Sequence, residues 1–416
     1  MMHNSTEPIT KNRPPAPLRS PRAPLTVVVP TFNRARFLQE SLDSLLRQEW
    51  RPESILCVDD GSTDETRSVV ERYGKDVRYI GKPNGGKSSA LNLAIPTVQS
   101  EFVWIFDDDD IAYPWAVSTL VPVLQADPSL DFVFGAKDYG VSGPDGRLQF
   151  SRAAEVPSAL SAGLMTQRVS LFRESIFLLN GTIVRTKAMN AAGAFREDLF
   201  RSQDYEFLVR LAAKARFSYI DRSIYMMRRH DEERGPANSR SDAASRQRVW
   251  RRFDSAIGAY LRNELDIAVF SDELTELVRT NPELHTVPAE RFARITRAWT
   301  LATKSQLATM SEDLLAALEV YGTELSGVEK NRLGELMNHH YFVDAIMESI
   351  RPLLRLCRLR KSANGRYALR QFARALYWQT RRASGPRHKV IAMTFSALYL
   401  FFALQGTSAQ PRPEGR

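Results

Sequence analysis

The sequence Phe102-Val-Trp-Ile-Phe106 runs directly into four aspartates, Asp107-Asp-Asp-Asp110. Five apolar residues bounded by charge are typical of a short buried strand. Four carboxylates in one small region repel one another, and a divalent cation is the usual remedy. The alternative is a solvated acidic turn that simply ends a strand, and the residues upstream decide between the two.

Short apolar runs alternate with helical patterns on both sides of this stretch. Apolar runs at 25–29, 55–58, 77–80 and 132–134 are separated by predicted helices, and the whole pattern indicates βαβ units in an α/β fold with a mainly parallel sheet. The carboxyl ends of parallel strands meet at one edge of a sheet, where ligands bind. Three polar loops should therefore converge there: residues 31–34, 59–60 and 107–110.

The amino-acid composition is that of a globular protein. The chain has 416 residues, 43% of them hydrophobic and 25% charged, which is ordinary for a globular protein. Only two cysteines occur, Cys57 and Cys357, so a reducing, cytoplasmic location is the simpler expectation. Residues 1–24 are rich in Pro and Arg without an apolar core, which predicts a disordered leader rather than a secretory signal.

Four consecutive motifs carry a family resemblance. VVVPTFNR (27–34), ILCVDDGSTDET (55–66), GKPNGGKSSALNLAI (81–95) and FVWIFDDDDIAYP (102–114) resemble, in order and spacing, the family 2 glycosyltransferases of the GT-A fold. The resemblance extends over about 25–230, roughly half the chain, and predicts a catalytic domain at 25–240. It implies transfer of a sugar from a nucleotide-diphosphate donor, of UDP type, to a hydroxyl acceptor with inversion.

The resemblance also implies roles for individual residues. Nucleotide-sugar binding maps onto the loops after the first two strands, the Gly-rich turn and the start of the acidic motif: Pro30, Thr31, Asn33, Arg34, Asp59, Asp60, Lys87, Asp107 and Asp108. The D-x-D motif of the family falls on the aspartate quartet, with its register uncertain by one residue. Metal binding maps onto Asp109, Asp110 and His230, and oxygen ligands suit Mg²⁺ or Mn²⁺.

The predicted general base is Asp204, at the start of an amphipathic helix. In the family the base is the Asp of a Glu-Asp pair that precedes such a helix; here Gln203 replaces the Glu, and Glu206 is the reserve candidate. A helix N-terminus keeps a carboxylate ionised, although an acid in the first turn is also common without any function. His230 is weighed evenly between a metal ligand and a structural histidine, and the preceding Arg228 and Arg229 are candidates for neutralising phosphate charge.

The Gly-rich turn also supports an alternative interpretation, a P-loop NTPase. Residues 81–88 match the P-loop pattern G-x-x-x-x-G-K-[ST] and follow a predicted strand. The helix after the turn has only about ten residues, and a P-loop NTPase would leave PTFNR and DDGSTDE without a role. A non-catalytic nucleotide-sugar-binding protein on the same scaffold is the other alternative.

Strand patterns stop at about residue 241. Amphipathic helical patterns follow, which predicts a helical basic extension at 241–389 and an apolar terminal helix with a polar tail at 390–416. Twelve Lys or Arg and no Asp or Glu lie between Arg351 and Lys389, next to the apolar run 390–404. A basic flank beside an apolar helix too short to span a bilayer suggests peripheral contact with an anionic membrane, on its cytoplasmic face. Packing of this helix on its own domain is the alternative, and no nucleic-acid motif accompanies the charge. A saccharide or lipid-linked acceptor would suit such a location.

Overall fold

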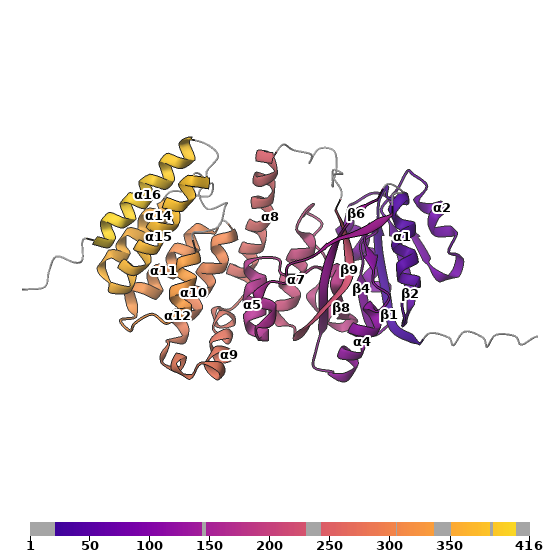
Figure 1. Cartoon of the computed structure of the whole chain (residues 1–416), viewed down its shortest axis with the longest axis horizontal. Coiled ribbons are helices and arrows are strands. Elements are labelled where there is room, and N and C mark those ends of the chain that lie inside the picture. The colour runs from indigo at the N-terminus through magenta and orange to yellow at the C-terminus, as the bar shows by residue number, and fades with distance from the viewer. Residues whose placement is uncertain are drawn as a thin grey trace, which may run out of the picture.

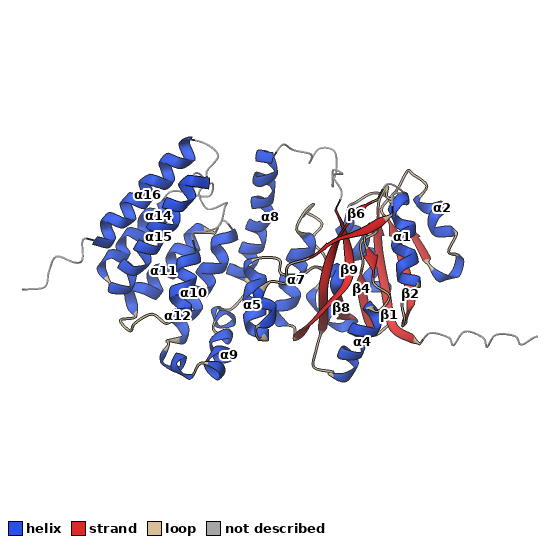
Figure 2. Cartoon of the chain, in the orientation of Figure 1, coloured by secondary structure: helices blue, strands red, loops and turns tan. Residues whose placement is uncertain are grey.

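The computed structural model describes residues 21–143, 147–229, 243–304, 306–336, 351–382 and 386–404. A sheet with its flanking helices occupies one end of the long axis, and helices alone occupy the other end (Figure 2). Helices α5 and α7 lie between the two parts (Figure 1). The predicted α/β domain followed by helices is therefore the architecture of the described chain.

Nine strands form a single mixed sheet. They are β1 (Arg22–Thr31), β2 (Arg51–Asp59), β3 (Arg78–Gly81), β4 (Phe102–Ile105), β5 (Ile111–Ala112), β6 (Phe132–Ser142), β7 (Leu148–Ala153), β8 (Thr182–Arg185) and β9 (Phe217–Arg229). Their order is β3-β2-β1-β4-β8-β6-β9-β5, with β7 paired to the outer part of β6. The first four positions in this order are parallel, whereas β8 runs antiparallel to both β4 and β6.

This topology places the polar loops as expected. Strand β1 lies between β2 and β4 and is parallel to both, so the three carboxyl ends meet at one edge. Val27 pairs with Ile55 on one side and with Trp104 on the other. The segments after Thr31, Asp59 and Phe106 consequently leave the sheet side by side.

Helices cover both faces of the sheet. They are α1 (Ala35–Leu46), α2 (Thr66–Glu71), α3 (Lys87–Ala94), α4 (Ala116–Ala126), α5 (Leu164–Arg173), α6 (Thr186–Ala192) and α7 (Gln203–Lys214). Helix α1 buries Leu38, Leu42 and Leu45, whose spacing puts them on one side of the helix, in the same core as Trp104 of β4. Helices α3 and α7 bury their apolar faces against the opposite side of the sheet.

The boundary of the predicted leader at residue 24 is wrong by a few residues. Strand β1 begins at Arg22, and Arg22 and Ala23 pair with Arg51 and Pro52 of β2. Ala23 is buried, so pairing with the neighbouring strand outweighs the Pro and Arg composition of this segment. Residues 1–20 lie outside the described part of the chain.

The second part of the chain is helical throughout its described residues. It contains α8 (Ala243–Asn263), α9 (Asp272–Thr280), α10 (Ala289–Leu301), α11 (Leu307–Val320), α12 (Gly327–Glu335), α14 (Arg351–Arg355), α15 (Ala363–Arg382) and α16 (Pro386–Leu404). Ile257 and Leu261 of α8 join the same hydrophobic core as Phe207 of α7, so the helical part packs directly on the α/β part. Among the described helices, none is both long and apolar enough to cross a membrane.

Candidate active site

The loops after β1 and β2 are tied together by hydrogen bonds. The Asn33 amide donates to Ser62 Oγ at 2.8 Å, and the Thr63 amide donates to Asn33 Oδ1 at 2.8 Å. Asn33 has a φ of 53°, a left-handed conformation that asparagine tolerates better than most residues. Pro30 and Thr31 end β1 in buried positions beside Val58 and Asp59.

Asp59 and Asp60 both hold groups of the protein. Asp59 accepts from Tyr79 Oη at 2.7 Å and from the Ser62 amide at 2.8 Å. Asp60 accepts from Lys82 Nζ at 2.7 Å and from the amides of Gly85 and Gly86 at 2.9 and 2.6 Å. These bonds fold the Gly-rich turn back over the end of β2, where a nucleotide base would lie in the resembled family.

The contacts of Asp60 also weaken the P-loop reading. In a P-loop the backbone amides of the glycine-rich turn cradle phosphates. Here the amides of Gly85 and Gly86 point at the Asp60 carboxylate, and the following helix α3 has only 8 residues. Because the Asp60 carboxylate occupies the amides that would bind phosphates, this turn is unlike a site for a nucleoside triphosphate.

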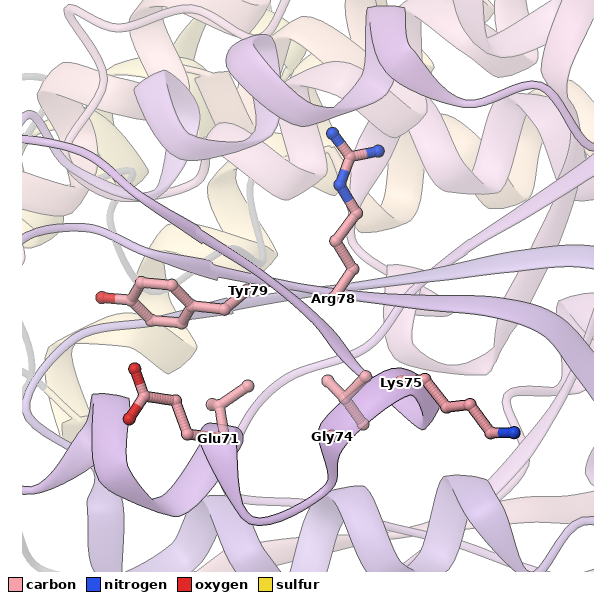
Figure 3. A pocket seen from close by; sticks show the side chains of 7 residues that line it. Glu71, Gly74, Lys75, Arg78 and Tyr79 are labelled. Atoms are coloured by element: carbon pink, nitrogen blue, oxygen red, sulfur yellow. The ribbon is translucent and has the colours of Figure 1, made fainter.

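A hollow of about 440 Å³ lies between the end of α2 and the start of the edge strand β3. Figure 3 shows part of its lining: Glu71 of α2, Lys75 of the turn that follows, and Arg78 and Tyr79 of β3. None of these residues belongs to the predicted site. Tyr79 is the connection between the two, because its hydroxyl reaches Asp59. Burial and this hydrogen bond raise the pKa of Tyr79 to about 12, so it remains a donor at neutral pH.

Three of the four aspartates converge, and Asp108 is the one outside this group. One ligand oxygen each from Asp107, Asp109 and Asp110 lies within 4.8 Å of the others, an arrangement that fits a divalent cation. Asp108 is also buried but does not belong to this group; burial, and then the charge of Asp108, raises the pKa of the Cys57 thiol in β2. Burial and repulsion from Asp109 raise the pKa of Asp108 to about 7. Tertiary geometry thus brings Asp107 to the predicted ligands Asp109 and Asp110.

Asn180 is a site residue that the sequence did not reveal. Its Nδ2 donates to Asp107 Oδ2 at 3.0 Å and to Asp110 Oδ2 at 2.5 Å. Trp104 Nε1 donates to the backbone oxygen of Asn180 at 2.7 Å, which holds this residue in place. It lies just before β8, the antiparallel strand beside β4, and no motif in the sequence marks it.

Arg228 supports the quartet from β9 and is completely buried. Its amide donates to Asp110 Oδ1 and its Nε to the backbone oxygen of Asp109, both at 2.9 Å. Its guanidinium also pairs with Glu40 and Ser142, so it positions the acidic loop rather than facing a phosphate. His230 lies outside the described residues.

Lys87 links the quartet to the predicted general base. Its Nζ donates to Asp107 Oδ1 at 2.6 Å and to Asp204 Oδ2 at 2.7 Å. Burial lowers the pKa of Lys87, but the attraction of these two carboxylates outweighs burial and raises it overall. Arg34 approaches the same cluster, with Nη1 3.5 Å from Asp109 Oδ2. Side chains from the loops after β1 and β4 and from the first turns of α3 and α7 therefore meet within a few ångströms.

Asp204 and Glu206 differ in how their oxygens are used. The Oδ1 atom of Asp204 is buried and has no hydrogen-bond partner in the described part of the chain. Burial raises the pKa of Asp204, and the nearby Lys87 opposes this rise. Glu206 binds Arg210 through both oxygens, at 2.7 and 2.9 Å, and is buried. Of the two candidates, only Asp204 has an oxygen left to accept a proton.

Known proteins share this fold. The structure of residues 1–349 of S. aureus TarS in complex with UDP-GlcNAc superposes with a TM-score of 0.50 at 19% identity, covering 80% of this chain and 89% of that one. This likeness and the strand order show that the chain has the GT-A fold.

Sequence comparison identifies the family. The model of glycosyl transferase family 2 matches residues 26–183, so this α/β segment of the chain is a member of that family. An uncharacterized glycosyltransferase of Rickettsia felis is 30% identical over 232 residues, 55% of this chain and 37% of that protein. The hyaluronan synthase of Pasteurella multocida is 28% identical over 216 residues, 49% of this chain and 20% of that protein. The chain thus spans about a third or less of the length of these two relatives.

Proposed function

We propose that the chain transfers a sugar from a UDP-type nucleotide-sugar to a hydroxyl group of a saccharide or lipid-linked acceptor, with inversion at the anomeric carbon. The observation that carries this proposal is the junction made by Lys87, which joins the metal-compatible acids to Asp204. The reaction needs departure of a diphosphate and deprotonation of a hydroxyl at neighbouring positions. The metal-compatible acids would serve the first need, and Asp204 would serve the second.

Asp107, Asp109 and Asp110 would hold Mg²⁺ or Mn²⁺, because three hard oxygen ligands converge and Asn180 orients two of them. A bound divalent cation would neutralise charge on the departing diphosphate. Lys87 would add a positive charge on the same side. The loops at Thr31–Arg34 and Asp59–Asp60 would enclose the base and ribose, and Asp108 lies near Thr31 and Arg34 of the first loop.

Asp204 would act as the general base. Its free oxygen would accept the proton of the acceptor hydroxyl while that hydroxyl attacks the anomeric carbon. A single displacement needs no second carboxylate as nucleophile. The unpartnered, buried oxygen favours an enzyme over a non-catalytic binding protein, because burying a polar atom without a partner is unfavourable unless it has a use.

A panel of nucleotide-sugars tests the proposal. Release of nucleotide diphosphate is measured with each donor, with Mn²⁺ and with EDTA, and the anomeric configuration of the product is read by NMR. We expect release from a UDP-sugar that EDTA abolishes. Binding of UDP-sugars without any release or transfer, across candidate acceptors, would favour the binding-protein alternative. ATP hydrolysis that requires Lys87 would favour the NTPase.

The C-terminal helices support a peripheral location on the cytoplasmic face of a membrane. Helix α16 packs one apolar side on α15 through residues such as Phe395 and Tyr399. A second side remains exposed and is also apolar: Val390, Met393, Ala397, Leu400, Phe401 and Leu404. Exposed basic residues of α15 and α16, among them Arg370, Arg374 and Lys389, accompany it, and no acid occurs between residues 351 and 404. An anionic bilayer surface complements both properties.

A further inference from the structure

Three basic side chains surround one tyrosine beside the acidic edge. Lys137 Nζ lies 5.7 Å from the centroid of the Tyr139 ring, the guanidinium carbon of Arg152 lies 4.7 Å away, and that of Arg229 lies 5.6 Å away. We name these four residues the Tyr139 cluster. They come from three neighbouring strands, β6, β7 and β9, of which β6 and β9 are seen side by side in Figure 1.

Strand register explains why the four side chains meet. Tyr139 pairs with Arg152 of β7 and with Met227 of β9, and Val141 pairs with Arg229. Lys137 and Tyr139 are two residues apart, so they share one face of β6. Asp138 between them faces the other way, where it accepts from Tyr113 Oη at 2.6 Å and from Ser223 Oγ at 2.8 Å. The single acid of this segment is thus turned away from the cluster.

The positive charges of the cluster have no carboxylate partner within the ranges that the structure describes. Among the described residues, no ion pair joins Lys137, Arg152 or Arg229 to an acid. Lys137 is partly buried, and burial lowers its pKa although Asp110 opposes this. Three like charges around one ring repel one another, and an oxyanion placed among them would remove that repulsion.

The cluster lies on the side of the quartet opposite to the nucleotide loops. Lys137 pairs with Tyr225, and the charges of Asp110 and Asp107 raise the pKa of that tyrosine in addition to burial. Arg229 directly follows Arg228, whose amide binds Asp110. The nucleotide loops, by contrast, follow β1 and β2 at the other side of β4. A molecule contacting the cluster would reach the quartet from the side away from the nucleotide loops.

We infer that the Tyr139 cluster is a subsite for a negatively charged group of the acceptor, a phosphate or a carboxylate. The inference rests on the proposed function, because it takes the quartet as the place of sugar transfer. Arg152 and Arg229 suit such a group, since a guanidinium can donate two parallel hydrogen bonds to one oxyanion. The acceptor class is then an anionic glycan or a phosphate-bearing polyol rather than a neutral sugar.

Binding of three probes to the full chain tests this inference. The probes are a glycerol-phosphate oligomer, a glucuronic acid oligomer and an uncharged glucose oligomer of equal length, each titrated by calorimetry with and without UDP and Mn²⁺. We expect one anionic probe to bind at least about tenfold more tightly than the glucose oligomer. The preferred anionic probe tells a phosphate from a carboxylate source.

Variants locate the effect. Arg152→Gln with Arg229→Gln should remove the preference, and Arg152→Lys with Arg229→Lys should retain part of it because the charge remains. Lys75→Gln with Arg78→Gln is the matched control, since it removes the same charge from exposed residues beside β3. Should the Gln pair fail to fold, the single variant Arg152→Gln on the exposed strand β7 decides instead.

Equal binding of all three probes would overturn the inference, as would an equal loss in the control pair. Retention of the preference by the Gln pair would overturn it too. The titration of UDP with Mn²⁺ distinguishes failure of this inference from failure of the proposed function. Wild-type protein that fails to bind UDP with Mn²⁺ contradicts the proposed function, whereas the anion preference is measured independently of UDP.

Discussion

The ammonium group of Lys87 lies 2.7 Å from the carboxylate of Asp204, although 117 positions separate them in the chain. Lys87 begins α3 and Asp204 lies in the first turn of α7. The contact pairs the predicted base with a residue of the predicted donor site. In the proposed reaction, the Lys87 side chain would turn toward the diphosphate when a donor binds. The Asp204 carboxylate would then lose its ion pair with Lys87 and be available as the general base.

Replacing Asp204 by Asn should abolish transfer while donor binding survives. The amide cannot accept a proton, so we expect kcat to fall by roughly 10²–10⁴-fold. Transfer is followed by product release and UDP binding by calorimetry. Glu206→Gln is the comparison: it breaks a buried ion pair with Arg210 and should lower the melting temperature with a smaller effect on kcat. The opposite pattern would assign the base to Glu206.

Replacing Lys87 by Met should weaken the binding of nucleotide diphosphates. The loss of one positive charge beside the phosphates is worth about tenfold or more in Kd, whereas uridine binding should stay within about twofold. Calorimetry with UDP and with uridine measures both. An equal loss for the two ligands would show that Lys87 maintains the fold of the site rather than contacting phosphate.

Replacing Asn180 by Ala should weaken metal binding. Asn180 orients Asp107 and Asp110, and residues that orient ligands typically contribute 10–100-fold to metal affinity, so a loss of about that size is expected. Titration of Mn²⁺ followed by electron paramagnetic resonance, in the presence of UDP, gives the affinity. Asn190→Ala, at an exposed position on α6, is the control and should leave it unchanged. Unchanged affinity in Asn180→Ala would remove this residue from the site.

The buried lysine Lys304 should make stability depend on pH. Its Nζ lies 4.6 Å from the ring of Tyr205 and 3.9 Å from Asp254, and burial lowers its pKa to about 8. The folded state therefore disfavours its charged form, and this destabilisation is present below pH 8 and disappears as pH rises toward the unfolded pKa of about 10.4.

Lys304→Met should consequently raise stability at pH 7, by at most roughly 2–3 kcal/mol. The advantage over wild type should shrink by pH 10. Urea denaturation at both values measures this difference, and Lys214→Met at an exposed position of α7 is the control. An advantage that is the same at pH 7 and pH 10 would show that the titration of Lys304 is not its cause.

The exposed side of α16 should bind anionic bilayers. The full chain should sediment with vesicles of phosphatidylglycerol and remain free of vesicles of phosphatidylcholine. Leu400→Ser with Phe401→Ser should lower vesicle binding by about tenfold or more, because burial of each side chain is worth roughly 1.5–3 kcal/mol. Val320→Ser, which changes an exposed residue of α11, is the control. Loss of self-association in the double variant, without any vesicle binding in wild type, would indicate a second copy as the partner.

The sequence by itself determined the fold class and the edge at which the site lies. Alternating apolar runs predict parallel strands, and parallel strands bring the loops after Thr31, Asp59 and Phe106 to one edge whatever the side-chain details. Local sequence patterns were less informative where pairing with a neighbouring strand outweighs amino-acid composition. Arg22 is an example, because β1 begins there, within the predicted leader.

Tertiary structure alone decided which side chains face one another. Asn180, just before β8, and Arg228, in β9, reach the quartet from segments that are distant in sequence, and no local pattern encodes such contacts. Asp204 and Glu206 are both acids in the first turn of α7, yet pairing with Arg210 occupies only Glu206. The physical reason is that strand order and register, which set these distances, depend on the packing of the whole sheet.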